Sequence, residues 1–146
     1  MLTPISERRL LQSAVSVLAL VPIVAGFLGL AKGIQVFDAH AAVSRSGDSH
    51  IRYLSGLMLA TGLGYWTTVP GIEAQRTRFR LLTALVVTGG FGRLYAVTLF
   101  GLPASSMVVG LIMELVVAPS LALWRERIEQ RCAASAQSST PILSSR

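Results

Sequence analysis

The chain has 146 residues, of which 52% are apolar and only 14% are charged, whereas an ordinary soluble domain carries about 25% charged residues. The apolar content excludes a disordered chain, and the single cysteine excludes a disulfide scaffold. The net charge of +6 does not point to a nucleic-acid partner, because the basic residues cluster between long apolar runs. The composition predicts an all-α polytopic membrane protein.

Four segments are long and apolar enough to cross a bilayer. A helix needs about 20 apolar residues to span a hydrocarbon core about 30 Å thick. The candidate spans are roughly residues 10–31, 51–69, 81–100 and 104–124. Gly101 and Pro103 separate the last two, since proline disfavours helix at the residue before it. We therefore expect one four-transmembrane-helix bundle over residues 1–131.

The two ends of the chain differ in character. The first apolar run exceeds the core of about 7 to 15 residues of a signal peptide, so we expect a retained helix. Arg125 and Glu129, four residues apart, predict an ion pair that extends the last helix. Residues 132–146 are rich in Ala and Ser and are predicted to form a disordered cytoplasmic tail.

The distribution of basic residues predicts the orientation in the membrane. Nine lie on the side of the termini: Arg8, Arg9, Arg76, Arg78, Arg80, Arg125, Arg127, Arg131 and Arg146. Three lie on the other side: Lys32, Arg45 and Arg52. By the positive-inside rule, both termini and the loop between the second and third spans are cytoplasmic. Trp66 and Trp124 fall at inner ends of their spans, as expected for an interfacial belt.

Two charged residues lie within the third and fourth spans. Arg93 is seven residues from the outer end of its span and Glu114 ten from the outer end of its own, so their depths differ by about 5 Å. An arginine side chain covers that difference, and we expect the two to pair across the hairpin. Pro119 removes the helical hydrogen bond to Leu115, beside Glu114. The pair is interpreted either as a functional site or as a purely structural contact.

Small residues share helix faces with these charges. Gly89 lies four residues before Arg93, and Gly110 and Ala118 flank Glu114 at the same spacing. The second span repeats the pattern with Arg52, Gly56, Ala60 and Gly64, and the first has Gly29 and Gly33. Such stripes are where membrane helices approach each other. We therefore expect contact surfaces there and close packing at Gly89, Gly90 and Gly92.

Arg52 and His50 lie at the outer mouth of the predicted bundle. If Glu114 neutralises Arg93, Arg52 and His50 remain as uncompensated cationic groups that suit a carboxylate, phosphate or lipid headgroup. The predicted ligand-binding residues are thus Arg52, Arg93, Glu114 and His50. The alternative for Arg52 is a simple interfacial anchor.

The outer loop contains a repeated Asp-x-His pattern, formed by Asp38 with His40 and Asp48 with His50. Four such side chains are possible zinc ligands, but their spacing matches no compact metal motif. We expect solvated loop residues, no metal and no cofactor. No nucleophilic triad or phosphate-binding glycine loop is recognisable, so no catalytic residue is predicted.

The chain resembles a bacterial family of small four-helix membrane proteins, the domain of unknown function numbered 4345. The resemblance rests on HIRYLSGLMLATGLGYW from His50 to Trp66, RFR at 78–80, GGFGRLYAV from Gly89 to Val97, GLP at 101–103 and MELVVAP from Met113 to Pro119. It covers most of the chain. It implies the fold and a bacterial inner-membrane location, and it implies no reaction.

Three functions are compatible with these residues. The first is binding of an amphiphilic or anionic small molecule or lipid at a polar cluster in the outer half of the bundle. The second is a structural or accessory subunit that packs against another membrane protein or a second copy of itself. The third is an intramembrane enzyme that uses Glu114 as acid or base with assistance from His50, and a difference in depth of about 15 Å between these two residues disfavours it.

Overall fold

The computed structural model describes residues 4–37 and 42–138, and all regular structure in these ranges is helical. The elements are α1 (Pro4–Lys32), the 3₁₀ turn η1 (Gly33–Val36), α2 (Arg45–Thr68), α3 (Arg76–Phe100), α4 (Ser105–Ile112), the π-helical turn η2 (Met113–Val117) and α5 (Ala118–Ser138). The last three follow one another without a break. The chain therefore forms four long helical segments, and the all-α prediction is confirmed for the described residues.

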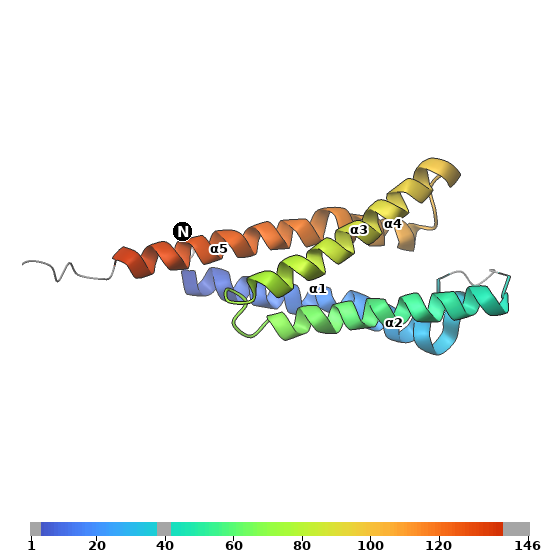
Figure 1. Ribbon diagram of the computed structural model, residues 1–146, viewed down its shortest axis with the longest axis horizontal. Helices are drawn as coiled ribbons and strands as arrows, with labels where there is room; N and C mark the ends of the chain where they lie inside the picture. Colours follow the sequence, from blue (N-terminus) through green and yellow to red (C-terminus); the bar gives the residue numbers. More distant parts are fainter. Residues whose placement is uncertain (1–3, 38–41, 139–146) are drawn as a thin grey trace, which may run out of the picture.

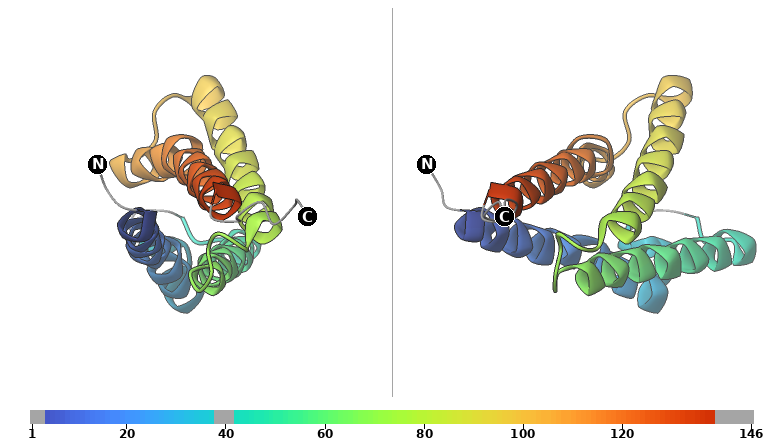
Figure 2. Two further views of the ribbon diagram at one scale, coloured as in Figure 1. Left: turned by 90° about the vertical axis from the view of Figure 1, so that its left-hand side faces the viewer. Right: turned by 60° about the vertical axis from the view of Figure 1, so that its left-hand side comes forward.

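The four segments run alternately up and down, and each packs against two neighbours. α1 packs against α2 and α5, and α3 packs against α2 and α5, while the diagonal pairs make no contact within the described ranges. The start of α1, the end of α5 and the α2–α3 connection lie at one end of the molecule (Figure 1). Toward the opposite end, α3 and α4 diverge from α1 and α2 (Figure 2).

Three stretches are long and apolar enough to cross a membrane: Ser6–Val36, Arg76–Phe100 and Ser105–Arg131. They contain the first, third and fourth predicted spans. The second predicted span, residues 51–69, does form most of α2, but α2 does not reach the same apolarity. Its many Gly, Ser, Thr and aromatic residues, together with Arg52, contribute little hydropathy.

The helix ends explain the predicted breaks. α3 ends at Phe100, and Gly101 adopts a φ of 84° at its C-cap, in the left-handed region that glycine enters without a Cβ clash. α2 begins where the Ser44 hydroxyl accepts a hydrogen bond from the Gly47 amide at 3.0 Å.

α5 continues to Ser138, so the first part of the predicted disordered tail is helical, because Ala and Gln favour helix. The remainder, residues 139–146, lies outside the described residues.

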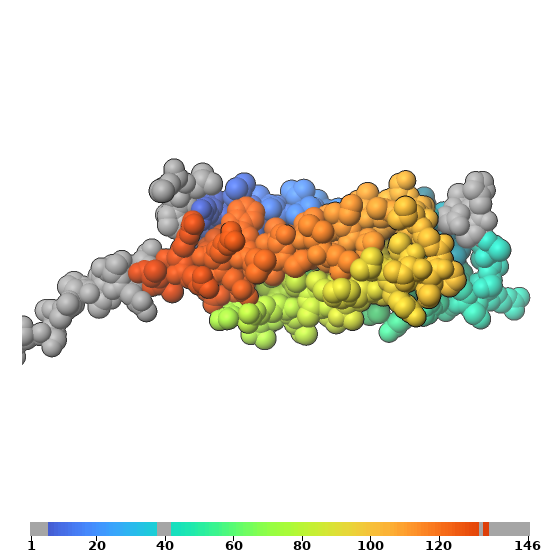
Figure 3. All heavy atoms as spheres, turned by 90° about the horizontal axis from the view of Figure 1, so that it is seen from above, coloured from blue at the N-terminus to red at the C-terminus, as the bar shows by residue number. Residues whose placement is uncertain are grey.

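The buried apolar core is concentrated at the end that carries the termini. It contains residues from every long helical segment and from the α2–α3 connection: Leu11, Val15, Ala19, Tyr65, Ile72, Phe79 and Ile128. The Tyr65 and Phe79 rings pack edge to face with centroids 5.2 Å apart. The Tyr65 hydroxyl also lies 3.0 Å from that of Thr83. In the described residues of α4 and η2 no side chain is fully buried, so the end of the molecule at which α3 and α4 meet, at the right of Figure 3, is the more open part.

Glycines bring α1 and α2 into backbone contact. A Cβ atom on Gly26 would lie 2.6 Å from the Leu59 amide nitrogen, and one on Gly62 would lie 3.0 Å from the Ile23 amide nitrogen. Gly29 faces the Ser55 side chain at similarly short range. These residues form the α1–α2 contact surface.

The predicted stripe on α2 is only partly correct. Gly64 does pack closely, but against Leu82 of α3, whereas a Cβ on Gly56 would meet only a Leu30 methyl at 3.8 Å and Ala60 is exposed. The physical reason is the rotation of the helix. Successive side chains point about 100° apart around the helix axis. In an apolar helix the sequence pattern alone does not define which small residues face the neighbouring helix.

We expect Gly26→Ala to lower the stability of the protein in mild detergent. The new methyl group meets backbone atoms of α2, so the two helices must separate, at a cost of about 1 to 3 kcal/mol. Gly89→Ala is the matched control, because a Cβ there would meet no atom of another helix within 4 Å in the described part of the chain. Thermal unfolding should show a lower midpoint for Gly26→Ala only. Equal midpoints for the two variants would contradict the contact surface.

Candidate functional site

Arg93 and Glu114 form an ion pair between α3 and the π turn η2. The Arg93 Nε donates a hydrogen bond to Glu114 Oε1 at 3.1 Å and lies 3.0 Å from Oε2. The side chains are 33% and 20% exposed. The Oε2 contact lacks hydrogen-bond geometry, so this oxygen is held by charge alone. The predicted contact across the hairpin is present, and whether the pair binds a ligand stays a prediction.

The backbone around Glu114 is locally widened. Met113–Val117 forms a π turn, in which the Ala118 amide reaches back to the Met113 carbonyl, directly before Pro119. Proline cannot donate a backbone hydrogen bond, and π turns accommodate such interruptions, often at functional sites. The sequence predicted the disturbance one turn before Pro119, and the structure has it there.

Two glycines allow the helices to approach at the pair. A Cβ on Gly90 would lie 2.7 Å from a Leu115 methyl and 3.0 Å from Glu114 Cβ, and Gly110 lies beside the Arg93 guanidinium. The expectation of close packing is wrong for Gly89 and Gly92, whose Cβ positions have nothing within 4 Å. These two lie on other faces of α3, since neighbouring helical residues point about 100° apart.

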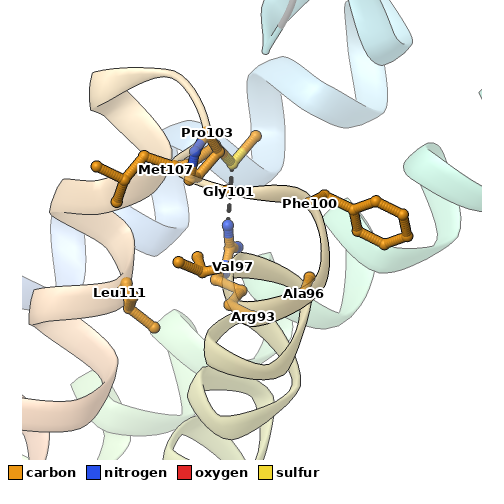
Figure 4. Close-up of a pocket in the computed structure, with 9 residues that line it drawn as sticks. Arg93, Ala96, Val97, Phe100, Gly101, Pro103, Met107 and Leu111 are labelled. Atoms are coloured by element: carbon orange, nitrogen blue, oxygen red, sulfur yellow. Dashed lines mark hydrogen bonds between the residues drawn. The ribbon is translucent and has the colours of Figure 1, made fainter.

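A pocket of 260 Å³ lies between the C-terminal end of α3 and α4, and Arg93 of the ion pair forms part of its wall. Among the residues that the structure describes, Arg93 is the single charged one in the lining, which otherwise consists of Ala96, Val97, Phe100, Gly101, Leu102, Pro103, Met107 and Leu111. Figure 4 shows the Arg93 side chain extending toward Met107, with Leu111 and Val97 beside it. The volume lies slightly below the range typical of small-molecule sites, about 300 to 1,000 Å³.

The pocket-facing part of Arg93 has only a weak acceptor. Its Nη1 lies 2.9 Å from the Met107 sulfur, and a thioether accepts hydrogen bonds poorly. The Nε donor is used by Glu114, and Nη2 has no acceptor within the part of the chain that the structure describes. The guanidinium therefore presents donors to an apolar pocket without a strong protein acceptor.

Arg52 is not an uncompensated cation, and that prediction is wrong. Its Nε donates to Asp48 Oδ2 at 2.8 Å, and its Nη1 donates to the carbonyl oxygens of Leu30 and Ala31. It therefore caps the C-terminal end of α1, where carbonyls lack helical partners and the helix dipole favours a cation. The hydrogen bond from Arg52 holds the pKa of Asp48 below its ordinary value. This arrangement fits the anchor alternative.

The other predicted outer residues do not gather at the pocket. His50 is exposed in the first turns of α2 and does not line the pocket of Arg93. Asp48 also accepts a 3.3 Å hydrogen bond from the Ile34 amide, so it connects η1 to α2. Asp38 and His40, the first half of the Asp-x-His repeat, lie outside the described residues.

Sequence reasoning missed that Arg125 is buried. Arg125 is 1% exposed and donates from Nη1 to the carbonyl oxygens of Ile72 and Glu73 and from Nη2 to Glu129. The predicted Arg125–Glu129 pair is thus confirmed at 2.7 Å, but Arg125 also fixes the α2–α3 connection. Its position directly after Trp124, at the end of the fourth predicted span, was the available signal.

Further ion pairs connect the helices at the same end. They join Arg8 to Glu73, Arg131 to Glu7, Arg80 to Glu126 and, at 3.9 Å, Arg76 to Glu129. Most of these groups are partly exposed, and exposed pairs contribute little stability each. Arg125 differs from them because it is buried and bonds to backbone.

An all-α chain with three helices apolar enough to cross a membrane, and with a charged pair between two of them, is typical of an integral membrane protein. The chain belongs to the family described as Domain of unknown function (DUF4345), whose model matches residues 10–125. No curated protein and no solved structure matches the chain. The family assignment agrees with the resemblance found in the sequence and carries no assigned activity.

Proposed function

We propose that the chain is a four-span protein of the bacterial inner membrane with both termini in the cytoplasm. α2 serves as the remaining span because it packs along α1 and runs between the same two ends of the molecule as the three apolar stretches. Burial of its glycine-rich face against α1 reduces the polar surface that lipid meets. The nine-to-three excess of basic residues at the end with the termini supports the orientation.

Single cysteines at Ser46 and Thr77 test this topology in a background without Cys132. Ser46 lies near the start of α2 and Thr77 near the start of α3, at opposite ends of the molecule. On intact cells, a membrane-impermeant thiol reagent should label Ser46→Cys and leave Thr77→Cys unlabelled until the membrane is broken. The reverse pattern would overturn the orientation, and labelling of both would overturn the span count.

We further propose that the protein binds an amphiphilic molecule at the pocket between α3 and α4. The observation that carries this is a mostly apolar pocket with one guanidinium in its wall, whose Nη1 faces a thioether. Apolar walls hold the hydrocarbon part of such a molecule, and the guanidinium holds an oxygen-bearing head group. The pocket lies at the outer end of the α3–α4 hairpin, so the amphiphile enters from the outer leaflet.

The alternative is an accessory subunit that packs against another membrane protein or a second copy. It is supported by the open Cβ positions at Gly89 and Gly92 and by the neighbouring exposed side chains of Leu85, Phe91 and Tyr95. Lipid covers such a surface equally well, because apolar side chains facing lipid are normal in a bilayer. The pocket is the more specific observation, and it favours amphiphile binding over the accessory role.

Filling the pocket tests amphiphile binding. Leu111→Trp places a large ring in the lining, whereas Ile112→Trp adds the same ring at the next, exposed position outside it. After purification in mild detergent, mass spectrometry should find an amphiphile retained by the parent and by Ile112→Trp and lost from Leu111→Trp. The same retained amphiphile in all three proteins would contradict binding at this pocket.

A further inference from the structure

The charge balance of the Arg93 pocket restricts which head groups it accepts. Arg93 and Glu114 are the only charged residues between 81 and 124, and their contact makes the site neutral overall. An anion that binds while Glu114 stays ionised leaves one net negative charge in an apolar region, which is costly. Two acidic groups that share one cation also favour protonation of one of them.

The geometry of the pair leaves room for a second acidic group. Both Glu114 oxygens lie at the Arg93 Nε, at 3.1 and 3.0 Å. The Nη1 atom points instead toward Met107 and the pocket (Figure 4). A head group in the pocket therefore reaches the guanidinium without displacing any atom of Glu114 sterically. Binding of the head group changes the number of negative charges that the Arg93 guanidinium alone must balance.

Within residues 4–37 and 42–138, no other charged group relieves this imbalance. η2 packs against α3, α4 and α5. On α3 the charged group facing Glu114 is Arg93, and Tyr95 is largely exposed; α4 carries no titratable residue. On α5 the first charged residue is Arg125, which lies about 16 Å along the helix from Glu114 and bonds elsewhere. Any compensating charge must come from solution as a proton.

We propose that the site binds singly charged anionic amphiphiles together with one proton, which Glu114 takes up as the ligand anion becomes the counter-ion of Arg93. This inference rests on the proposed binding pocket. The exchange balances: the complex gains one negative charge from the head group and one positive charge from the proton, and the site stays neutral. Release of the ligand returns the proton and restores the Arg93–Glu114 ion pair.

Calorimetric titration of the detergent-solubilised protein with decyl sulfate tests the coupling, because this head group keeps its charge across the working pH range. The apparent Kd should weaken about tenfold per pH unit where free Glu114 is ionised. Titrations at one pH in phosphate and in Tris, whose ionisation heats differ, should show uptake of about one proton per ligand. This measurement needs no variant and does not depend on the folding of one.

Two variants and a neutral probe separate the possible results. Glu114→Gln keeps the shape of the side chain and should bind decyl sulfate more tightly, with no pH dependence and no proton uptake. Arg93→Gln should lose decyl sulfate binding. Decanol, which brings no charge, should bind the parent independently of pH if it binds at all.

The results distinguish this inference from the proposed function. Binding of decyl sulfate by the parent without pH dependence or proton uptake would overturn the coupling and leave the pocket intact. Binding of decanol but not of decyl sulfate, at every pH tested and by Glu114→Gln as well, would also overturn the coupling. Failure of both probes to bind any of the proteins would overturn the proposed amphiphile site itself.

Discussion

Arg93→Leu and Glu114→Leu are each expected to destabilise the protein by about 3 to 5 kcal/mol, because each leaves one unpaired charge in an apolar region. The double substitution should recover most of that loss, since two leucines pack between α3 and η2 without any charge to compensate. Unfolding free energies of the parent, the two single variants and the double variant, measured in the same detergent, provide the coupling energy directly.

Arg78→Leu is the matched control for the loss of one positive charge. Arg78 is exposed near the start of α3, so its removal should change stability by no more than about 0.5 kcal/mol. Additive losses for Arg93 and Glu114, with a coupling below about 0.5 kcal/mol, would mean that the two residues do not stabilise the fold as a pair. The double variant also tests amphiphile binding, because it should fold but retain no amphiphile.

The helical segments and the Arg93–Glu114 contact could be predicted from sequence because the signals are strong and isolated. Long apolar runs define helices of membrane length, and Gly101 with Pro103 marks the break between the last two of them. A lone arginine and a lone glutamate at similar depth in adjacent helices have few other partners. In such a case the free-energy cost of an unpaired charge in lipid favours the contact between the two side chains.

Arg52 shows where this reasoning stops. Its i,i+4 partner Asp48 was readable from the sequence, but the Leu30 and Ala31 carbonyls become available only because α1 ends beside α2. Counting the charged side chains along the sequence ignores the backbone oxygens, which also compensate a cation. At a helix C-terminus these oxygens are strong acceptors, and a nearby arginine is compensated by them.

The glycine contacts were unpredictable for a different reason. Gly26 and Gly62 meet the backbone of a neighbouring helix, whereas a Cβ on Gly89 or Gly92 would meet nothing within 4 Å in the described part of the chain, although all four glycines lie inside long helices. In a soluble helix the polar face fixes the rotation, but α1 and α3 have little polar face over their apolar stretches. Which small residues form the contact is therefore decided by tertiary packing.

The second large effect is expected at Arg125. Arg125→Met keeps a long apolar stem but removes every donor, so the Ile72 and Glu73 carbonyls and the Glu129 carboxylate lose a partner at once. Because Arg125 is almost fully buried, water does not replace it freely. We expect a loss of about 3 to 5 kcal/mol in the free energy of unfolding, the range typical of breaking a buried charged contact.

Arg127→Met provides the control two residues away on the same helix. Arg127 is exposed, so the same substitution there should cost no more than about 0.5 kcal/mol. Proteolysis adds a local readout: the α2–α3 connection, residues 69–75, should be cut faster in Arg125→Met only, because its carbonyls are no longer held against α5. The stability of Arg125→Lys should lie between those of Arg125→Met and Arg127→Met, since an ammonium group cannot reach backbone and carboxylate acceptors in the same planar arrangement. Equal stability and equal cleavage of the two methionine variants would show that α5 does not hold this connection.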